Sequence, residues 1–206
     1  GSKLIERVIV STDSKDYAKI ALDEGAEGPF IRPSNIAGDK SSDKDFIDHA
    51  LEFFQKEGDC PEFIVHIRPT TPIRDPDVLD VAIEKFMSKK TASSLRSVHQ
   101  MSESAYKTFE ISEHNYLAPI SRDISAEESN NARQNFPDTY AANGYIDVLS
   151  TSHIQKYGAI HGDRIMPFIT PHTLEIDNLE DFTLIEDLLM SGRYETLKKK
   201  IFGGDN

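Results

Sequence analysis

The sequence has no tryptophan, a single cysteine and no long hydrophobic run. One cysteine, Cys60, excludes a disulfide within the chain and is typical of a reducing compartment. No apolar stretch approaches the ~20 residues needed to span a bilayer, and no secretory signal is visible, so we expect a cytoplasmic protein. Cations are also scarce, because 23 Lys and Arg residues stand against 35 Asp and Glu, a formal net charge of −12. Such a chain repels nucleic acids and anionic membranes, and we expect neither as a partner.

Glycine is too scattered to form a phosphate-binding loop. A doubly wound domain usually carries a glycine-rich loop after its first strand, but Gly25, Gly28 and Gly38 lie far apart. An anionic ligand would therefore need locally gathered cations or the help of a metal. The sequence also contains no Gly-x-Ser-x-Gly, Cys-x-x-Cys or P-loop motif.

Strand-like and helix-like segments alternate along most of the chain. We expect strands at 7–12, 63–67, 92–98, 143–149 and 174–177, and helices from Ser14 to about Glu24 and at 43–57, 76–86 and 179–190. This alternation predicts a single α/β domain over residues 1–206, three-layered and Rossmann-like, with a mostly parallel sheet. The pattern breaks from about His99 to Ala142, where we expect an inserted dimerisation arm.

The most informative segment runs from Arg68 to Arg74, with the sequence Arg-Pro-Thr-Thr-Pro-Ile-Arg. Its prolines end the preceding strand, because proline removes donors from the ladder. Ligands of open α/β sheets bind at the carboxyl ends of the strands, and guanidinium groups suit phosphates and carboxylates. The segment therefore predicts an anion site, although a surface turn with two solvated arginines is the alternative.

Glu175 and Asp177 stand two residues apart on the expected strand, so both carboxylates should project from one face. Two hard oxygen ligands suit Mg²⁺ shared with the phosphates of a nucleotide. The alternative is an exposed strand whose acidic side chains face water.

Weaker candidates lie elsewhere in the chain. The loop that follows Arg32 enters the helix at 43–57, where free amides bind anions, but capping alone would explain Ser42 and Asp43. Within the arm, Lys107 and Arg133 are either ligand contacts or ordinary surface charges. The amide of Asn143 either orders a loop or binds a substrate hydroxyl.

Taken together, the landmarks resemble the acylneuraminate cytidylyltransferase family, whose members make CMP-activated nonulosonic and related keto-acid sugars. The matching segments span nearly the whole chain in order: 8–14, 25–27, 31–33, 39–42, 68–74, 143–146, 174–177 and 181–182. The resemblance implies a nucleotidyltransferase fold and transfer of CMP from CTP to the anomeric hydroxyl of a sugar acid, with release of pyrophosphate.

The resemblance also implies roles for individual residues. Glu175 and Asp177 would hold Mg²⁺, the cofactor, and Asp177 and Lys107 are the catalytic candidates. Arg32, Ser41 and Arg68 would hold the cytidine end of CTP, with Asp43 as a weaker candidate for the base amino group. Lys107, Arg133 and Asn143 would orient the sugar acid. The arm implies a homodimer in which one copy reaches the site of the other.

Several departures accompany the resemblance. Family members begin with a strand and an Ala-Arg-Gly-Gly-Ser-Lys type of loop that holds the triphosphate, whereas this sequence starts after such a loop. Arg68 replaces a common glutamine, Glu175 a common aspartate, and Ala141 a common arginine, which suggests a substrate other than plain N-acetylneuraminate. We therefore expect the chain as written to be nearly inactive while retaining weak cytidine binding. The alternatives are a non-catalytic dimerising or nucleotide-binding module and another metal-dependent sugar-nucleotide enzyme.

Overall fold

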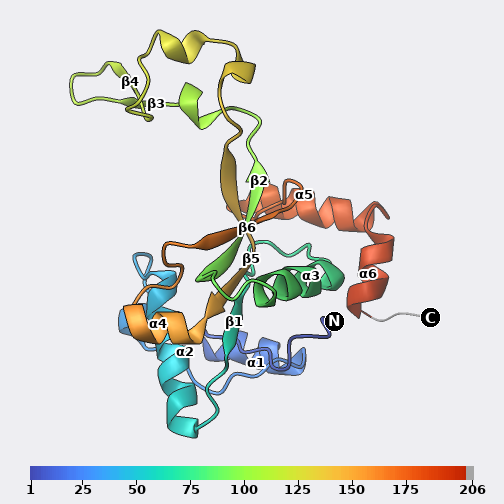
Figure 1. The fold of residues 1–206 in the computed structure, drawn as a ribbon. Coiled ribbons are helices and arrows are strands. Elements are labelled where there is room, and N and C mark those ends of the chain that lie inside the picture. The colour runs from blue at the N-terminus through green and yellow to red at the C-terminus, as the bar shows by residue number, and fades with distance from the viewer. Residues whose placement is uncertain (203–206) are drawn as a thin grey trace.

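A computed structural model describes residues 1–202 of the chain. Its centre is a four-stranded sheet in the order β1-β5-β2-β6, formed by β1 (Phe63–His66), β5 (Tyr140–Ser150), β2 (Ser94–Gln100) and β6 (Ile165–Ile169). β5 runs antiparallel to both of its neighbours, and β6 runs parallel to β2. β1, β2 and β6 therefore point the same way, and β5 is the one reversed strand of this sheet (Figure 1).

Helices cover both faces of the sheet, which confirms the predicted α/β class. On one face, α3 (Pro76–Met87) packs Leu79 and Ile83 against Leu95 and Val148. On the other face, α2 (Asp43–Glu57) and α4 (Thr151–Tyr157) pack around Leu149. Val148 and Leu149 are neighbours on β5 and face opposite sides of the sheet, so one strand contributes to both apolar clusters.

Local sequence signals explain the helix boundaries. α2 begins with a capping box between Ser42 and Asp45 and ends at Gly58, whose φ of 73° is left-handed. The carboxylate of Asp75 caps α3, and Pro76 occupies its first turn. The predicted helices at 43–57 and 179–190 are confirmed as α2 and α5 (Leu179–Met190). α1 (Lys15–Asp23) follows its Ser14 cap, as expected.

Two predicted strands are wrong, and three α-helices or strands of the body were not foreseen. The segment 7–12 forms only an isolated parallel bridge between Ile9 and Glu27, because no longer partner lies beside it among the described residues. The segment 174–177 is irregular and leaves the sheet after Thr170-Pro171. The unforeseen elements are β6, α4 and α6 (Glu195–Phe202).

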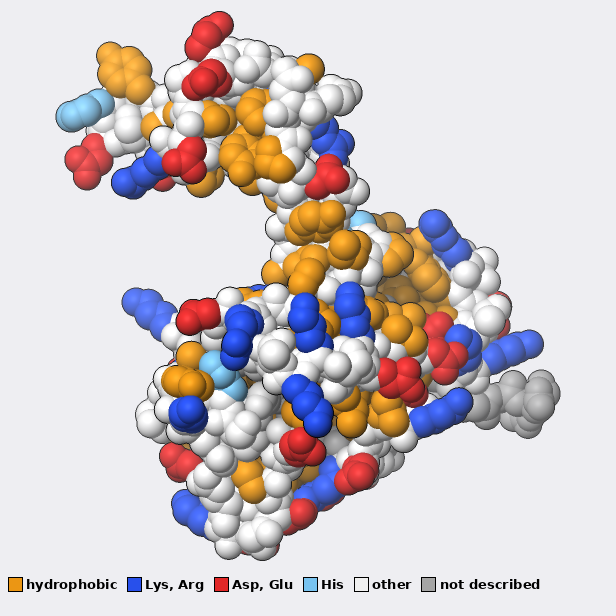
Figure 2. Space-filling model, viewed as in Figure 1, with side chains coloured by type: hydrophobic (Ala, Val, Ile, Leu, Met, Phe, Trp, Pro, Cys, Tyr) orange, Lys and Arg blue, Asp and Glu red, His pale blue; other side chains and the backbone are white. Residues whose placement is uncertain are grey.

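Residues between β2 and β5 form an arm that projects away from the sheet (Figure 1). It contains the hairpin of β3 (Phe109–Ile111) with β4 (Leu117–Pro119) and three short 3₁₀ helices at Ala105–Lys107, Glu128–Asn130 and Arg133–Asn135. Tyr106 and Phe136 stack with ring centroids 5.6 Å apart. Figure 2 shows a hollow between the arm and the body, and exposed hydrophobic side chains on the arm. A fourth 3₁₀ helix, Ser34–Ile36, lies in the body.

No helix within residues 1–202 is long and apolar enough to cross a bilayer.

Candidate functional site

The Arg68–Arg74 segment is a loop fixed by its own second arginine. Arg74 donates from Nε to the Tyr145 carbonyl at 2.8 Å, and from Nη2 to the carbonyls of Arg68 at 2.5 Å and Gly144 at 3.1 Å. Burial lowers the pKa of Arg74 to about 10, so its guanidinium remains charged at neutral pH. Arg74 therefore joins the loop to β5, and Arg68 is left to face the site.

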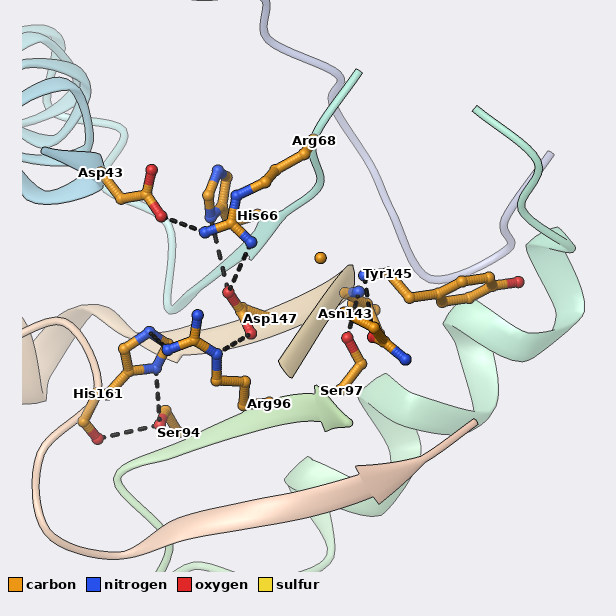
Figure 3. A network of polar contacts seen from close by, with 12 residues as sticks. Asp43, His66, Arg68, Ser94, Arg96, Ser97, Asn143, Tyr145, Asp147 and His161 are labelled. Atoms are coloured by element: carbon orange, nitrogen blue, oxygen red, sulfur yellow. Dashed lines mark hydrogen bonds and ion pairs between the residues drawn. The ribbon is translucent and has the colours of Figure 1, made fainter. Parts of the chain in front are cut away.

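Three of the predicted nucleotide-binding residues approach one another at the amino end of α2. Arg68 forms an ion pair with Asp43, the first residue of α2 (Figure 3). The guanidinium carbon of Arg32 lies over the Phe46 ring, 4.8 Å from its centroid. The rings of Phe46 and His66 pack edge-on with their centroids 5.3 Å apart. Arg32 is itself held by the hydroxyl and carbonyl oxygens of Ser11. Ser41 stands two residues before α2, where its N–H donates to the Gly38 carbonyl at 2.9 Å.

A buried carboxylate that the sequence analysis missed lies beside Arg68. Asp147 on β5 is 3% exposed, and its register places it between His66 on β1 and Arg96 on β2. Its oxygens lie 3.7 Å from Arg96 Nε, 3.8 Å from His66 Nδ1 and 3.9 Å from Arg68 Nη1 (Figure 3). The signal available in the sequence was a charged residue inside the apolar run from Ile146 to Leu149.

His161 completes this group from the loop before β6. Its Nε2 lies 3.3 Å from Arg96 Nη1, and its backbone carbonyl accepts from the Ser94 hydroxyl at 3.0 Å. Burial lowers the pKa of His161, and the nearby Arg96 charge lowers it further against the opposing effect of Asp147. Because arginine has no acceptor, the neutral imidazole accepts from Arg96 through Nε2.

Glu175 and Asp177 lie beside the same loop, although not on a strand. The Ile176 N–H donates to the Thr70 carbonyl at 2.8 Å, which holds the acidic segment against the 68–74 loop. Glu175 Oε1, Thr71 Oγ1 and Arg68 Nη1 would all lie within 3.2–3.4 Å of a Cβ atom at Gly144, so they converge on that glycine. Both carboxylate residues are exposed to solvent.

The donor set fits a magnesium ion that is shared with a nucleotide. Mg²⁺ in such sites takes one or two carboxylates and completes its shell with phosphates and water. Within residues 1–202, no three His, Cys, Asp or Glu side chains gather into a complete metal cage. The exposed carboxylates of Glu175 and Asp177, two residues apart, therefore offer the ligand chemistry that such an ion takes.

Asn143 is buried at 2% exposure, and its amide donates to Thr170 Oγ1 at 2.6 Å. Its Oδ1 accepts from the Tyr145 N–H at 3.3 Å, across the left-handed Gly144 with φ of 61°. In this arrangement the amide orders the turn within β5.

Lys107 and Arg133 lie on the arm, apart from the Arg68 group of the same chain (Figure 1). Lys107 Nζ donates to the Asn131 carbonyl at 2.8 Å, and Arg133 Nη2 donates to the Met101 carbonyl at 3.0 Å. Arg133 also lines a cavity of about 450 Å³ at the base of the arm, together with His99, Glu103 and His172.

Comparison with known proteins places this geometry in context. A family model described as cytidylyltransferase matches residues 1–201. The chain is 28% identical over 185 residues to the N-acylneuraminate cytidylyltransferase of Escherichia coli, which covers 89% of this chain and 42% of that protein. It is 26% identical over 193 residues to the CMP-N,N'-diacetyllegionaminic acid synthase of Legionella pneumophila, covering 91% of this chain and 80% of that protein.

Over a shorter stretch, the chain is 28% identical across 90 residues to the pseudaminic acid cytidylyltransferase of Campylobacter jejuni, 39% of that protein's length. The chain thus spans about two fifths of the length of these Escherichia and Campylobacter relatives. In structure it is similar to a CMP:2-keto-3-deoxy-manno-octonic acid synthetase complexed with CTP, with a TM-score of 0.62, 12% identity, and coverage of 92% of this chain and 83% of that one. The nucleotidyltransferase fold is shared, and the chain belongs to the cytidylyltransferase family.

Proposed function

We propose that the chain takes part in transfer of CMP from CTP to the anomeric hydroxyl of a nonulosonic or related keto-acid sugar. The observation that carries the proposal is the family match over residues 1–201, with Arg68, Asp43 and Arg32 close together at the amino end of α2. The named relatives include an N-acylneuraminate cytidylyltransferase and a CMP-diacetyllegionaminic acid synthase, which supports a nine-carbon keto-acid sugar as the acceptor.

In this reaction the sugar hydroxyl oxygen forms a bond to the α-phosphorus, and the bond from that phosphorus to the bridging oxygen of pyrophosphate breaks. Pyrophosphate leaves with the bonding electrons, and the hydroxyl proton passes to a base. Little covalent chemistry is required of the protein, so positioning and charge neutralisation dominate. When bound, Mg²⁺ would neutralise part of the triphosphate charge, which matters in a chain of net charge −12.

Each candidate residue has a part in this proposal. Glu175 and Asp177 would hold the metal, and their position beside the 68–74 loop brings them near Arg68. Arg32, Ser41 and Arg68 would contact the cytidine end, with Asp43 orienting Arg68. Lys107 and Arg133 would contact the sugar acid carboxylate, and Asn143 would order the turn that faces the sugar.

The location of Lys107 and Arg133 on the arm supports a homodimer. The arm exposes Ile111 at 71%, Tyr116 at 74% and Leu117 at 66%, which is costly for a hydrophobic surface left in water. In a two-fold dimer these side chains would pack on the other copy, and the arm cations would reach its site. A monomer in sedimentation equilibrium at micromolar concentration would contradict this assembly.

A nucleotide panel tests the proposed function. Thermal shifts with CTP, UTP, ATP and GTP in the presence of Mg²⁺ should show preferential stabilisation by CTP, because a ligand bound only by the folded chain raises its melting temperature. Pyrophosphate release should then be measured with N-acetylneuraminate, N,N'-diacetyllegionaminic acid and 2-keto-3-deoxy-octonate. Equal stabilisation by all four nucleotides, or none by any, would reject the assignment. In a full-length protein, binding of CTP without turnover on any acceptor would instead favour a nucleotide-binding module.

A further inference from the structure

A row of polar side chains interrupts the apolar sheet face under α2 and α4. His66, Asp147 and Arg96 are direct cross-strand partners on β1, β5 and β2. The next residues along that face, Ile64 and Leu149, belong to the apolar cluster with α2. A carboxylate at 3% exposure in this position is costly, and an apolar row would often serve stability as well or better. The row therefore calls for an explanation beyond packing.

The arginines, and not the carboxylate, are the accessible part of this group. The side chains of Arg68 and Arg96 are 29% and 32% exposed, whereas that of Asp147 is 3% exposed. Each Asp147 contact is between 3.7 and 3.9 Å, longer than a hydrogen bond, so the carboxylate aligns the guanidinium groups without consuming their donors. The surface that results presents N–H donors over a buried acceptor (Figure 3).

The orientation of Arg96 is set from two sides. Asp147 lies at its Nε, and His161 accepts at its Nη1. Ser94 holds His161 in turn, through the bond to its carbonyl and a 3.4 Å approach to Nδ1. An arginine fixed at two nitrogens loses little entropy on forming a further hydrogen bond, because its planar fork is already aligned.

The net charge of the group distinguishes between ligands. Arg68 and Arg96 supply two positive charges, and Asp43 and Asp147 supply two negative charges. A triphosphate would favour a surface of net positive charge. A neutral surface whose accessible groups are donors suits a neutral oxygen that only accepts, such as an acyl carbonyl, better than a hydroxyl, whose own proton would find no acceptor on the guanidinium groups.

We propose that Arg96 is a specificity-determining residue that binds a neutral hydrogen-bond acceptor on the sugar acid, away from the anomeric carbon. Asp147 and His161 are positioning residues for it. The acceptor class is the acyl carbonyl of an acylamino sugar acid, which the site would prefer to an analogue that carries a hydroxyl in its place. This inference rests on the function proposed above, since it names a determinant of the sugar half of that site.

The test separates sugar binding from nucleotide binding in the whole chain. Calorimetry measures the dissociation constants of CTP with Mg²⁺ and of three sugar acids: N,N'-diacetyllegionaminic acid, N-acetylneuraminate and the 5-hydroxy analogue of N-acetylneuraminate. Arg96→Gln should weaken binding of the two acylated acids roughly 10- to 100-fold, the effect of losing a hydrogen bond from a charged donor. It should change binding of the hydroxy analogue less, and leave CTP binding within about twofold. Arg96→Lys should bind the acylated acids with an affinity between those of the parent chain and Arg96→Gln. Arg164→Gln, at an exposed arginine, serves as the control.

Asp147→Asn should weaken acylated-acid binding in the same direction, because Arg96 loses its alignment. Should that variant unfold, Arg96→Gln and Arg96→Lys still decide the matter, with circular dichroism melts as a check. Loss of CTP binding with unchanged sugar binding would assign the group to the nucleotide and overturn the proposal. Unchanged binding of all ligands, or equal losses for all with a lowered melting temperature, would also overturn it.

Failure of the proposed function remains distinguishable from failure of this inference. Selective loss of sugar binding in Arg96→Gln without any CMP transfer by the full-length protein would support the inference and reject the reaction. Normal transfer and unchanged acceptor preference in Arg96→Gln would support the reaction and overturn the inference. Failure of the parent chain to bind any of the three acids would overturn the inference directly.

Discussion

Replacing Arg74 by methionine should unfold the chain at a clearly lower temperature, because the guanidinium joins the 68–74 loop to β5. Its donors serve the carbonyls of Tyr145, Gly144 and Arg68, and Tyr145 is a buried residue at 7% exposure. Leaving a buried carbonyl without a donor costs about 1–3 kcal/mol, and the two half-buried carbonyls cost less because water reaches them. Burying the charged guanidinium costs desolvation energy, as its lowered pKa indicates. An apolar methionine at this position avoids that cost, which offsets part of the loss.

We therefore expect a net loss of about 3 kcal/mol in the free energy of unfolding. For a chain of 206 residues this corresponds to a melting temperature lower by about 6–12 °C. Differential scanning calorimetry and urea titration should give the same ranking, with Arg74→Lys between the parent and Arg74→Met. Arg122→Met is the control, since Arg122 is exposed on the arm and its loss should cost less than about 0.5 kcal/mol. A loss below about 1 kcal/mol in Arg74→Met would show that the loop is held by other contacts.

Three further predictions concern the acidic pair, the turn in β5 and the half-buried His161. In a full-length protein, Asp177→Asn should reduce CMP transfer by roughly 10²–10³-fold without changing the melting temperature, whereas Glu186→Gln, at an exposed carboxylate on α5, should leave transfer unchanged. Gly144→Ala should weaken CTP binding and lower the free energy of unfolding more than Gly58→Ala does. Both glycines are left-handed, but only at Gly144 would a Cβ atom crowd polar side chains, at 3.2–3.4 Å. Equal losses of stability would contradict the convergence of Glu175, Thr71 and Arg68 on Gly144. Burial lowers the pKa of His161, so as the pH falls the unfolded chain binds a proton at this histidine before the folded chain does. The free energy of unfolding should therefore fall as the pH falls through about 6.5. His161→Gln should flatten that part of the profile of urea midpoint against pH.

The sequence predicted those elements whose boundaries are set by neighbouring residues. α2 begins at a capping box and ends at a left-handed glycine, both of which are visible within a few residues of the chain. The prediction of a strand at 174–177 used the same local information and was wrong, because alternation of apolar and acidic residues does not reveal whether a partner strand is within reach. Within the segment 174–177, only the Ile176 N–H donates to a backbone carbonyl of the described residues, that of Thr70, more than a hundred residues earlier.

The group around Asp147 escaped prediction for a related physical reason. Its members come from β1, β2, β5 and the loop before β6, and they meet only because β5 lies between β1 and β2 in one register. Strand order and register are tertiary properties, so no window of sequence contains them. Arg68, by contrast, was predicted because the prolines that follow it, Pro69 and Pro72, mark the end of its strand.

The reversed strand β5 connects the separate parts of the candidate site. It carries Asn143 and Gly144 beside the acidic segment, and Asp147 beside the arginines. A slip of one residue in its pairing would turn Asp147 toward the apolar face under α3, away from Arg96 and His66. The irregularity between Arg96 and Val98 opposes such a slip, because the Ser97 hydroxyl accepts from the Ile146 N–H at 2.9 Å within it. The register that buries Ile146 and Val148 against α3 is thus the register that places Asp147 between His66 and Arg96, so packing of the core and assembly of the polar row depend on the same pairing.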